Sequence, residues 1–162
     1  MSKKIAAVFL PLMALAFMGC GFYYSATPTP EQILLPTESA QELPLLVGDW
    51  HITINQSGGI AGTSRTLEIS GSGDLTIFDM RTNKQIVARL PADKLAELVR
   101  LVASSKYHAP SEPSGCVDCF IYTLVINNGD RNFQAQLDDV SLPDSGLHPL
   151  LFFLGKYLSG PN

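Results

Sequence analysis

The sequence predicts an α+β domain, with a mainly antiparallel sheet of about six strands and two helices packed on one face of that sheet. Three observations support this class. Several short segments alternate apolar with polar residues, which is the period of a strand with one buried face. Turn-forming residues separate neighbouring strand segments, so hairpins and an antiparallel sheet are expected. Only two segments have helical character.

Four strands are expected before the first helix. The first is the clearest, because Trp50, Ile52 and Ile54 alternate with polar residues until the Ser-Gly-Gly run at 57–59 breaks the pattern. The Gly-Ser-Gly-Asp sequence at 71–74 is a hairpin signal. The four expected strands cover residues 50–55, the region around 67–69, 75–78 and 85–90.

A helix that begins at Pro91 is expected next. Its apolar residues recur at i, i+3, i+4 and i+7, and Asp93 in the first turn suits the helix dipole. The apolar stripe consists of Leu95, Leu98, Val99 and Val102. A polar loop that contains proline is expected over residues 104–114.

Two further strands and a short helix complete the predicted domain. The strand at 120–126 alternates cleanly, and the Asn-Asn-Gly-Asp sequence at 127–130 is the strongest hairpin turn in the chain. The return strand covers 133–137. An acidic loop at 138–146 precedes a short apolar helix at about 149–158.

The N-terminus predicts export and lipid anchoring. Residues 1–19 are expected to be a lipoprotein signal peptide, because Lys3 and Lys4 precede a run of thirteen uncharged residues. Gly19 and Cys20 resemble the end of the bacterial lipobox, in which a small residue precedes the lipidated cysteine. Lipidation of Cys20 would hold the domain on the extracytoplasmic side of the cell membrane.

Two alternatives remain open for this segment. Ala14 and Ala16 form an A-x-A-like site for ordinary signal cleavage, which would leave Cys20 as a free exported thiol. Alternatively, residues 5–24 are long and apolar enough to span a bilayer uncut. All three interpretations place the folded part outside the cytoplasm.

Residues 20–48 are expected to be the lipidated cysteine and a proline-rich tether, and residues 49–160 the folded domain. The tether shows neither a helical nor a strand period, and proline stiffens it. Its prolines are Pro28, Pro30, Pro36 and Pro44. As a flexible coil it would span roughly 30 Å, which lifts the domain clear of lipid headgroups.

Charge and motif content narrow the function classes. Without Lys3 and Lys4, nine basic residues face fifteen acidic ones, a net charge of −6, so nucleic acid is not an expected partner. The sequence lacks GxSxG and HExxH motifs, and His51, His108 and His148 are isolated from one another. We therefore expect a protein that is not an enzyme and needs no resident metal or cofactor.

Cys116 and Cys119 form a CxxC pair. If Cys20 carries lipid, an even pair is left in an oxidising compartment, which favours a structural disulfide. A redox dithiol is an alternative, but the alternation from Phe120 onward predicts a strand where a low thiol pKa usually needs a helix N-terminus. Half of a zinc site is the other alternative, although no second CxxC exists.

Two loops contain further candidate site residues. The glycine-rich loop consists of Gly58, Gly59, Ile60, Ala61 and Gly62. It is either a flexible hairpin loop or a binding loop that presents Ile60 as an exposed apolar tip. The second loop contains Asp138, Asp139 and Asp144, and it is expected to be solvated because it lacks the EF-hand spacing of a calcium site.

Taken in order, several segments resemble emfourin-like proteins. They are the Gly-Gly-x-Ala-Gly loop at 58–62, the leucine-rich helix at 95–102, the Cys-x-Asp-Cys-Phe-x-Tyr stretch at 116–122, and the Asp-Asp…Pro…Leu-x-Pro-Leu end at 138–150. The resemblance covers roughly residues 50–158, which is the whole predicted domain.

This resemblance implies inhibition of an extracytoplasmic, thermolysin-like zinc metalloprotease. In the family, one loop brings a carboxylate to the zinc and a neighbouring loop places apolar side chains in substrate subsites. Ile60 matches the apolar tip, and the candidate carboxylates are Asp118, Asp138 and Asp139, because residues 56–65 contain no acid. The alternatives are a non-inhibitory adaptor or scaffold lipoprotein and a thiol-redox lipoprotein.

Overall fold

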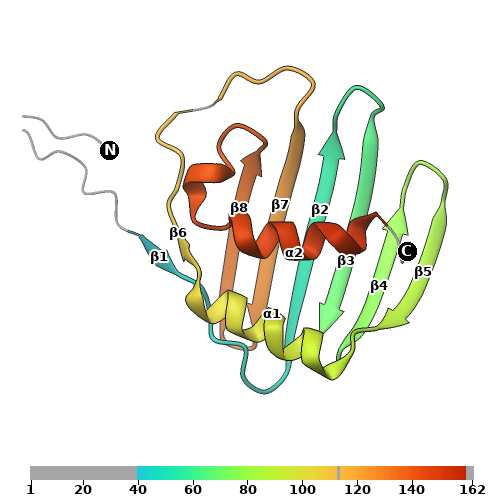
Figure 1. Cartoon of the computed structure of the whole chain (residues 1–162), viewed down its shortest axis with the longest axis vertical. Helices are drawn as coiled ribbons and strands as arrows, with labels where there is room; N and C mark the ends of the chain where they lie inside the picture. Colours follow the sequence, from blue (N-terminus) through green and yellow to red (C-terminus); the bar gives the residue numbers. More distant parts are fainter. Residues whose placement is uncertain (1–39, 113, 160–162) are drawn as a thin grey trace, which may run out of the picture. The chain divides into compact units, whose positions relative to one another are not determined.

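The computed structural model describes residues 40–112 and 114–159. The predicted signal peptide, Cys20 and most of the predicted tether lie outside these residues. The described part contains a six-stranded antiparallel sheet and two α-helices, which confirms the predicted α+β class (Figure 1). A small two-stranded sheet is an addition to the prediction.

The large sheet has the strand order β5-β4-β3-β2-β7-β8, and every neighbouring pair is antiparallel. Its strands are β2 (Trp50–Gly58), β3 (Thr63–Ser70), β4 (Asp74–Asp79), β5 (Lys84–Arg89), β7 (Phe120–Asn128) and β8 (Arg131–Asp138). Hairpins connect all neighbours except β2 and β7, which meet because the chain crosses over the sheet after β5. This crossover places β7, from the second half of the chain, beside β2.

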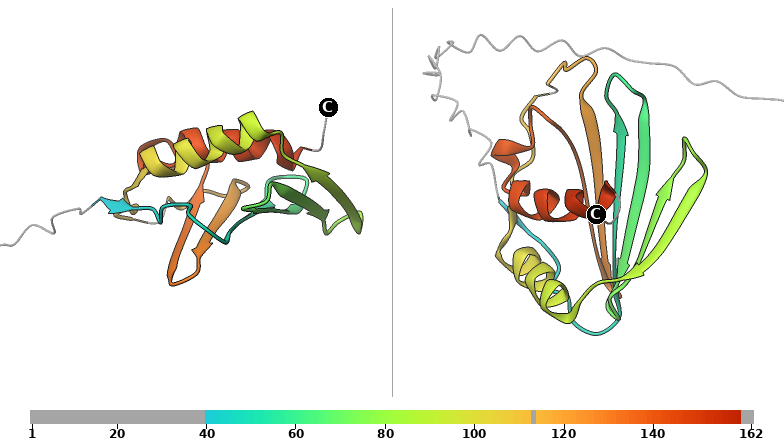
Figure 2. Two further views of the ribbon diagram at one scale, coloured as in Figure 1. Left: turned by 90° about the horizontal axis from the view of Figure 1, so that it is seen from below. Right: turned by 45° about the vertical axis from the view of Figure 1, so that its right-hand side comes forward.

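Both helices lie on the same face of the sheet, as predicted (Figure 2). The first, α1 (Ala92–Ser104), buries Leu98 and Val102 from the predicted apolar stripe. The second, α2 (His148–Leu158), turns most of its apolar residues inward. Its buried residues are Leu150, Leu151, Phe153, Leu154 and Leu158.

The core lies between the helices and the centre of the sheet. On β2, Ile52 and Ile54 point toward the helices while His51 is exposed, as the alternation predicted. Ile54 is paired with Leu67 of β3 and Leu124 of β7, and all three are fully buried. Each such side chain contributes about 1.5–3 kcal/mol of hydrophobic stabilisation.

The folded part begins earlier than the predicted boundary at residue 49. The short strand β1 (Gln41–Glu42) pairs with β6 (Lys106–Tyr107), which lies inside the predicted 104–114 loop. Leu43 and Leu46 are buried in the core. The described end of the predicted tether is therefore part of the domain, and Pro44 between the two leucines interrupts any period that could have indicated this.

Two smaller differences concern the loops of the predicted site. Strand β2 continues past the predicted break, because its residues pair with β3 and β7 as far as Gly58. Backbone pairing does not require an apolar side chain, so the polar end of this strand gave no signal. The predicted acidic loop contains one turn of 3₁₀-helix, η1 (Pro143–Ser145).

Candidate functional site

The glycine-rich loop joins β2 to β3 and forms a tight turn at one end of the sheet (Figure 1). The Gly62 backbone N–H donates to the Gly59 carbonyl at 2.9 Å, which closes the turn. The Gly59 N–H donates to the Cys119 carbonyl at 3.1 Å. Ile60, at the tip of this turn, is 94% exposed.

Two of the glycines are required by close packing. Gly58 and Gly59 have φ values of +94° and +69°, which disfavour any residue with a side chain. A Cβ atom on Gly58 would collide with the Cys119 carbonyl, and one on Gly59 would lie 2.7 Å from the Phe120 ring. The first two glycines of the loop therefore pack directly against Cys119 and Phe120.

That neighbour is the turn containing Cys116 and Cys119. Their sulfur atoms are within bonding distance and their Cα atoms are 5.9 Å apart, which gives the predicted disulfide. Strand β7 begins directly after the pair, at Phe120, so the helix N-terminus that favours a reactive CxxC thiolate does not follow it. Among the residues that the structure describes, no cluster of three metal-ligating side chains occurs.

Within this turn, Asp118 and Val117 face solvent. Asp118 adopts a left-handed conformation with φ of 66°, which aspartate tolerates better than most residues. Val117 is 83% exposed. In the described part of the chain, no hydrogen bond reaches the Asp118 carboxylate, so this group is available to a partner.

Asp139 connects the loop after β8 to the start of β7. Its carboxylate accepts a hydrogen bond from the Phe120 backbone N–H at 2.8 Å and another from the Tyr122 hydroxyl at 3.1 Å. Burial is the main cause that raises the pKa of Tyr122, and the hydrogen bond to Asp139 raises it further. Asp139 therefore positions β7 and the disulfide turn that precedes it.

Asp138 has a similar role one residue earlier. Its carboxylate accepts hydrogen bonds from the Ser114 hydroxyl and from the backbone N–H groups of Val140 at 3.1 Å and Ser141 at 2.8 Å. These donors lower the pKa of Asp138 to about 2, with the Ser114 hydroxyl as the largest cause. A carboxylate with this many donors is held within the protein and is poorly placed to bind elsewhere.

These hydrogen bonds join three loops into one surface, which we call the loop platform. It consists of residues 58–62, 114–119 and 138–142. Its exposed apolar side chains are Ile60, Val117 and Val140, which are 94%, 83% and 57% exposed. The structure thus brings the glycine-rich loop, the cysteine pair and the three candidate carboxylates together, whereas Asp144 lies in η1 outside the platform and Cys20 lies outside the described residues. It separates the free carboxylate of Asp118 from the engaged ones of Asp138 and Asp139.

The structure also contains an aromatic groove that sequence reasoning missed. It has a volume of about 430 Å³ and lies between α2 and the part of the sheet next to the platform. Phe152 in its wall is 62% exposed, with the His148 ring stacked at 6.2 Å and the Lys156 ammonium 4.8 Å from its centre. His148 and Lys156 lie four residues before and four residues after Phe152, and this helical spacing is the signal in the sequence that could have indicated the groove.

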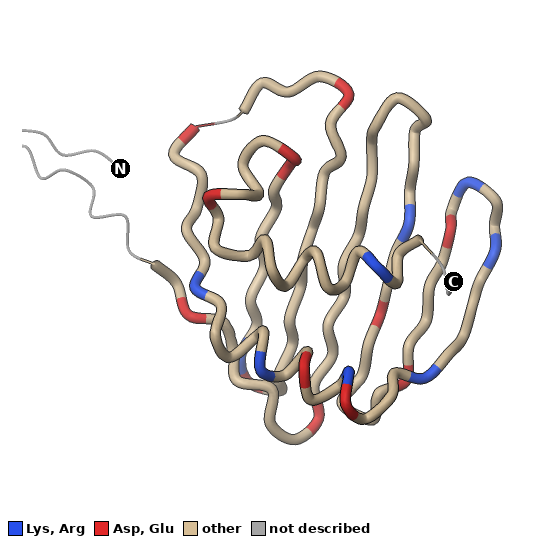
Figure 3. The backbone as a smooth tube through the Cα atoms, in the orientation of Figure 1, with Lys and Arg blue, Asp and Glu red and all other residues tan. Residues whose placement is uncertain are grey.

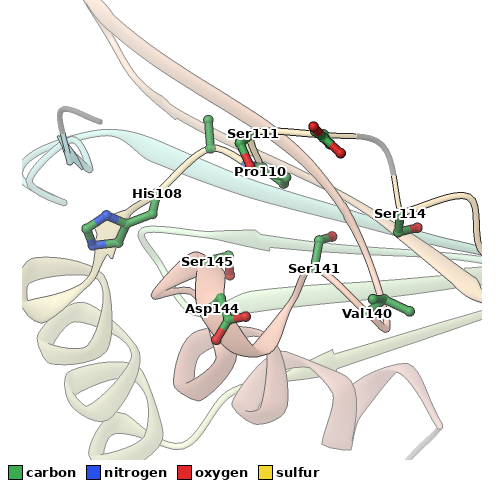
Figure 4. Close-up of a pocket in the computed structure, with 10 residues that line it drawn as sticks. His108, Pro110, Ser111, Ser114, Val140, Ser141, Asp144 and Ser145 are labelled. Atoms are coloured by element: carbon green, nitrogen blue, oxygen red, sulfur yellow. The ribbon is translucent and has the colours of Figure 1, made fainter. Parts of the chain in front are cut away.

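A second hollow lies beside η1, under the segment that follows β6 (Figure 4). Its volume is about 230 Å³, and its wall includes His108, Asp144 and Ser145. The contact that joins these segments is a backbone hydrogen bond from His108 to the Ser145 carbonyl at 2.9 Å. No hydrogen bond between the His108 ring and a serine hydroxyl occurs in the described ranges, so the geometry of an activated nucleophile is not formed there.

Comparison of the chain with protein-family models and with curated protein sequences found no match. Over the residues that the structure describes, we find no helix with both the length and the apolar character needed to cross a membrane.

Proposed function

We propose that this chain is a lipoprotein anchored at Cys20 outside the cytoplasm, and that its loop platform binds and inhibits a thermolysin-like zinc metalloprotease. The observation that carries the proposal is the hydrogen bond between Gly59 and Cys119, which holds an exposed apolar tip beside an exposed carboxylate. Two neighbouring loops with these two properties are what the resemblance to emfourin-like proteins implies for an inhibitor.

Ile60 is suited to enter an apolar substrate subsite. Burying an exposed isoleucine against a partner is worth about 2 kcal/mol. The closed turn from Gly59 to Gly62 holds the tip in place before binding, so less conformational entropy is lost on association. A rigid tip also resists the cleavage that a flexible substrate-like loop would undergo.

Asp118 is the carboxylate that we assign to the zinc of the protease. Carboxylate oxygen is a common zinc ligand and can displace the water that a metalloprotease activates. Asp138 and Asp139 are less suitable, because their oxygen atoms already accept hydrogen bonds within the platform. The position of Asp118 one residue before Cys119 places it directly beside the glycine-rich loop.

The proposal is tested by measuring peptide hydrolysis by thermolysin-like proteases in the presence of the full-length chain, purified in detergent. We expect inhibition at micromolar concentration or below. Ile60→Asp should weaken it at least tenfold, because a charge would enter an apolar subsite. Val87→Asp is the matched control, since Val87 is also exposed, at 72%, but lies on β5 outside the platform.

The zinc-directed role is tested separately with Asp118→Asn, which removes the charge and keeps a residue that tolerates the left-handed conformation. We expect at least tenfold weaker inhibition, and no change for Asp130→Asn in the β7–β8 turn. Absence of inhibition by the wild-type chain for every thermolysin-like protease of its own organism would overturn the proposal.

A non-inhibitory adaptor is the second candidate, and the engagement of Asp138 and Asp139 within the platform favours it. Ile60, Val117 and Val140 could bind a partner protein without any metal contact. In that case Ile60→Asp would disrupt the complex while Asp118→Asn would leave it intact. Equal binding to zinc-loaded and zinc-depleted protease would also indicate an adaptor.

A further inference from the structure

Strand β5 is an uncovered edge of the large sheet. It pairs with β4 on one side, and no strand of the described part of the chain pairs with its other side. All six of its residues are exposed, including Val87 at 72% and Ile86 at 38%. Figure 1 shows this hairpin beyond the ends of both helices. The edge is therefore accessible on both faces.

The hydrogen bonds between β4 and β5 determine which backbone groups of β5 face outward. The Leu90 N–H donates to the Gly73 carbonyl at 2.8 Å, so these two residues are a hydrogen-bonded pair that continues the β4–β5 register. Such pairs alternate along an antiparallel ladder. Gln85, Val87 and Arg89 therefore direct their backbone N–H and C=O groups away from β4.

Exposed edge strands are usually blunted by proline, bulges or charge, because their free backbone groups can pair with another chain. Strand β5 contains no proline and its pairing with β4 is regular. Its charges are cationic, with Lys84 and Arg89 at its ends and Arg81 in the preceding turn (Figure 3). Arg89 lies 4.0 Å from the Asp74 carboxylate in an exposed pair, and no ion pair of Lys84 occurs in the described part of the chain.

Antiparallel pairing of these outward groups with the β5 of a second copy would place Val87 opposite Val87 and Gln85 opposite Arg89. It would also bring the cations of both copies to one shared edge, which disfavours a homodimer.

We propose that β5 binds an extended acidic segment of a partner protein, which adds to the sheet as a seventh strand. The outward backbone groups require an extended partner, and the cations require acidic residues in it. Val87 on the open face and Ile86 on the helix face would contact alternate apolar side chains of the added strand. The residues of β5 itself lie outside the loop platform, and the Arg81 guanidinium donates to the Ala61 carbonyl of the platform at 2.9 Å.

The test uses the full-length chain and an end-capped, eight-residue peptide in which two central valines, one for each face of the sheet, are flanked on both sides by threonine and then glutamate. Amide hydrogen exchange is measured residue by residue with and without the peptide. Exchange at Gln85, Val87 and Arg89 should slow at least tenfold. Exchange at Ile86 and Ala88, which already donate to β4, should not change. Binding should also weaken as salt is added.

Variants of both partners make the test specific. Val87→Pro removes an outward N–H without removing a ladder donor, so the fold is retained and peptide affinity should fall at least tenfold. A peptide with N-methylated valines should lose binding to the wild-type chain. Combining Lys84→Glu with Arg89→Glu should reverse the preference toward the same peptide with lysine in place of glutamate, while Ile60→Asp should have no effect.

Three outcomes would overturn strand addition at β5. They are unchanged exchange at the three outward amides, equal affinity of the Val87→Pro variant and the wild-type chain, and a concentration-dependent homodimer in which those amides are protected without peptide. A chain that fails to inhibit any protease but shows the predicted exchange pattern would refute only the loop-platform proposal.

Discussion

The backbone N–H of Gly59 donates to the carbonyl of Cys119 at 3.1 Å, although the two residues are 60 positions apart in the sequence. This bond makes the glycine-rich loop and the disulfide turn one structure, and Asp139 holds the far side of the turn through Phe120. A change in any of these residues is therefore expected to affect the whole loop platform.

Gly58→Ala and Gly62→Ala should differ in their effect on stability. Both residues have positive φ, so each substitution introduces backbone strain of about 1–2 kcal/mol. A Cβ atom on Gly62 meets open space, whereas one on Gly58 collides with the Cys119 carbonyl. Gly58→Ala should therefore lower the free energy of unfolding by about 3 kcal/mol and Gly62→Ala by about 1 kcal/mol. Urea unfolding of the two variants measures the difference, and equal values would contradict the close packing.

Asp139→Asn should lower the pKa of Tyr122. In the wild-type chain, burial and the negative carboxylate both disfavour the ionised phenol. Removing the charge leaves the effect of burial, so the pKa should move toward the ordinary value of tyrosine without reaching it. The chemical shift of the Tyr122 ring followed by NMR from neutral to high pH measures this change. A pKa that does not move would show that Asp139 is not the partner of Tyr122 in solution.

The contribution of Asp138 to stability should disappear in acid. Its folded-state pKa of about 2 is below the ordinary 3.8, so the folded state favours the ionised form. This stabilisation is fully present above about pH 5, and it is lost as the pH falls through the unfolded and then the folded pKa. The stability gap between wild type and Asp138→Asn should therefore close between about pH 5 and pH 2. Urea unfolding at a series of pH values tests this, with Asp130→Asn as the control for net charge.

Most of the strands and both helices could be predicted because they bury one face. In β2, Ile52 and Ile54 differ in polarity from their neighbours, and this difference is what a period of two records. The end of the same strand, from Gln56 to Gly58, has no such contrast, because backbone hydrogen bonds hold it whatever the side chains are. The predicted strand accordingly ended too early.

Each loop of the platform could be predicted from its own sequence, but the contacts between the loops could not be predicted from local patterns. Their contact depends on β2 lying beside β7, which places Gly58 opposite Phe120. That neighbour relation is set by the crossover through α1, and no local pattern encodes it. The hydrogen bonds of Asp139 also depend on this strand arrangement, because their donors are Phe120 and Tyr122 of β7. The sequence therefore indicated an acidic loop without indicating which carboxylate remains free.

The segment before β2 offers the last prediction, because the structure distinguishes residues there that look alike in the sequence. Leu43 and Leu46 are only 5% and 8% exposed, whereas Leu45 and Val47 are 57% and 70% exposed. Replacing a buried leucine by alanine costs the lost transfer energy and leaves a cavity, about 2–5 kcal/mol in well-packed sites. The full-length chain with Leu43→Ala and Leu46→Ala should therefore lose at least about 3 kcal/mol of stability, while Leu45→Ala with Val47→Ala should change it by less than about 1 kcal/mol. Urea unfolding compares the two pairs, and a similar loss in both would mean that this segment is a tether after all.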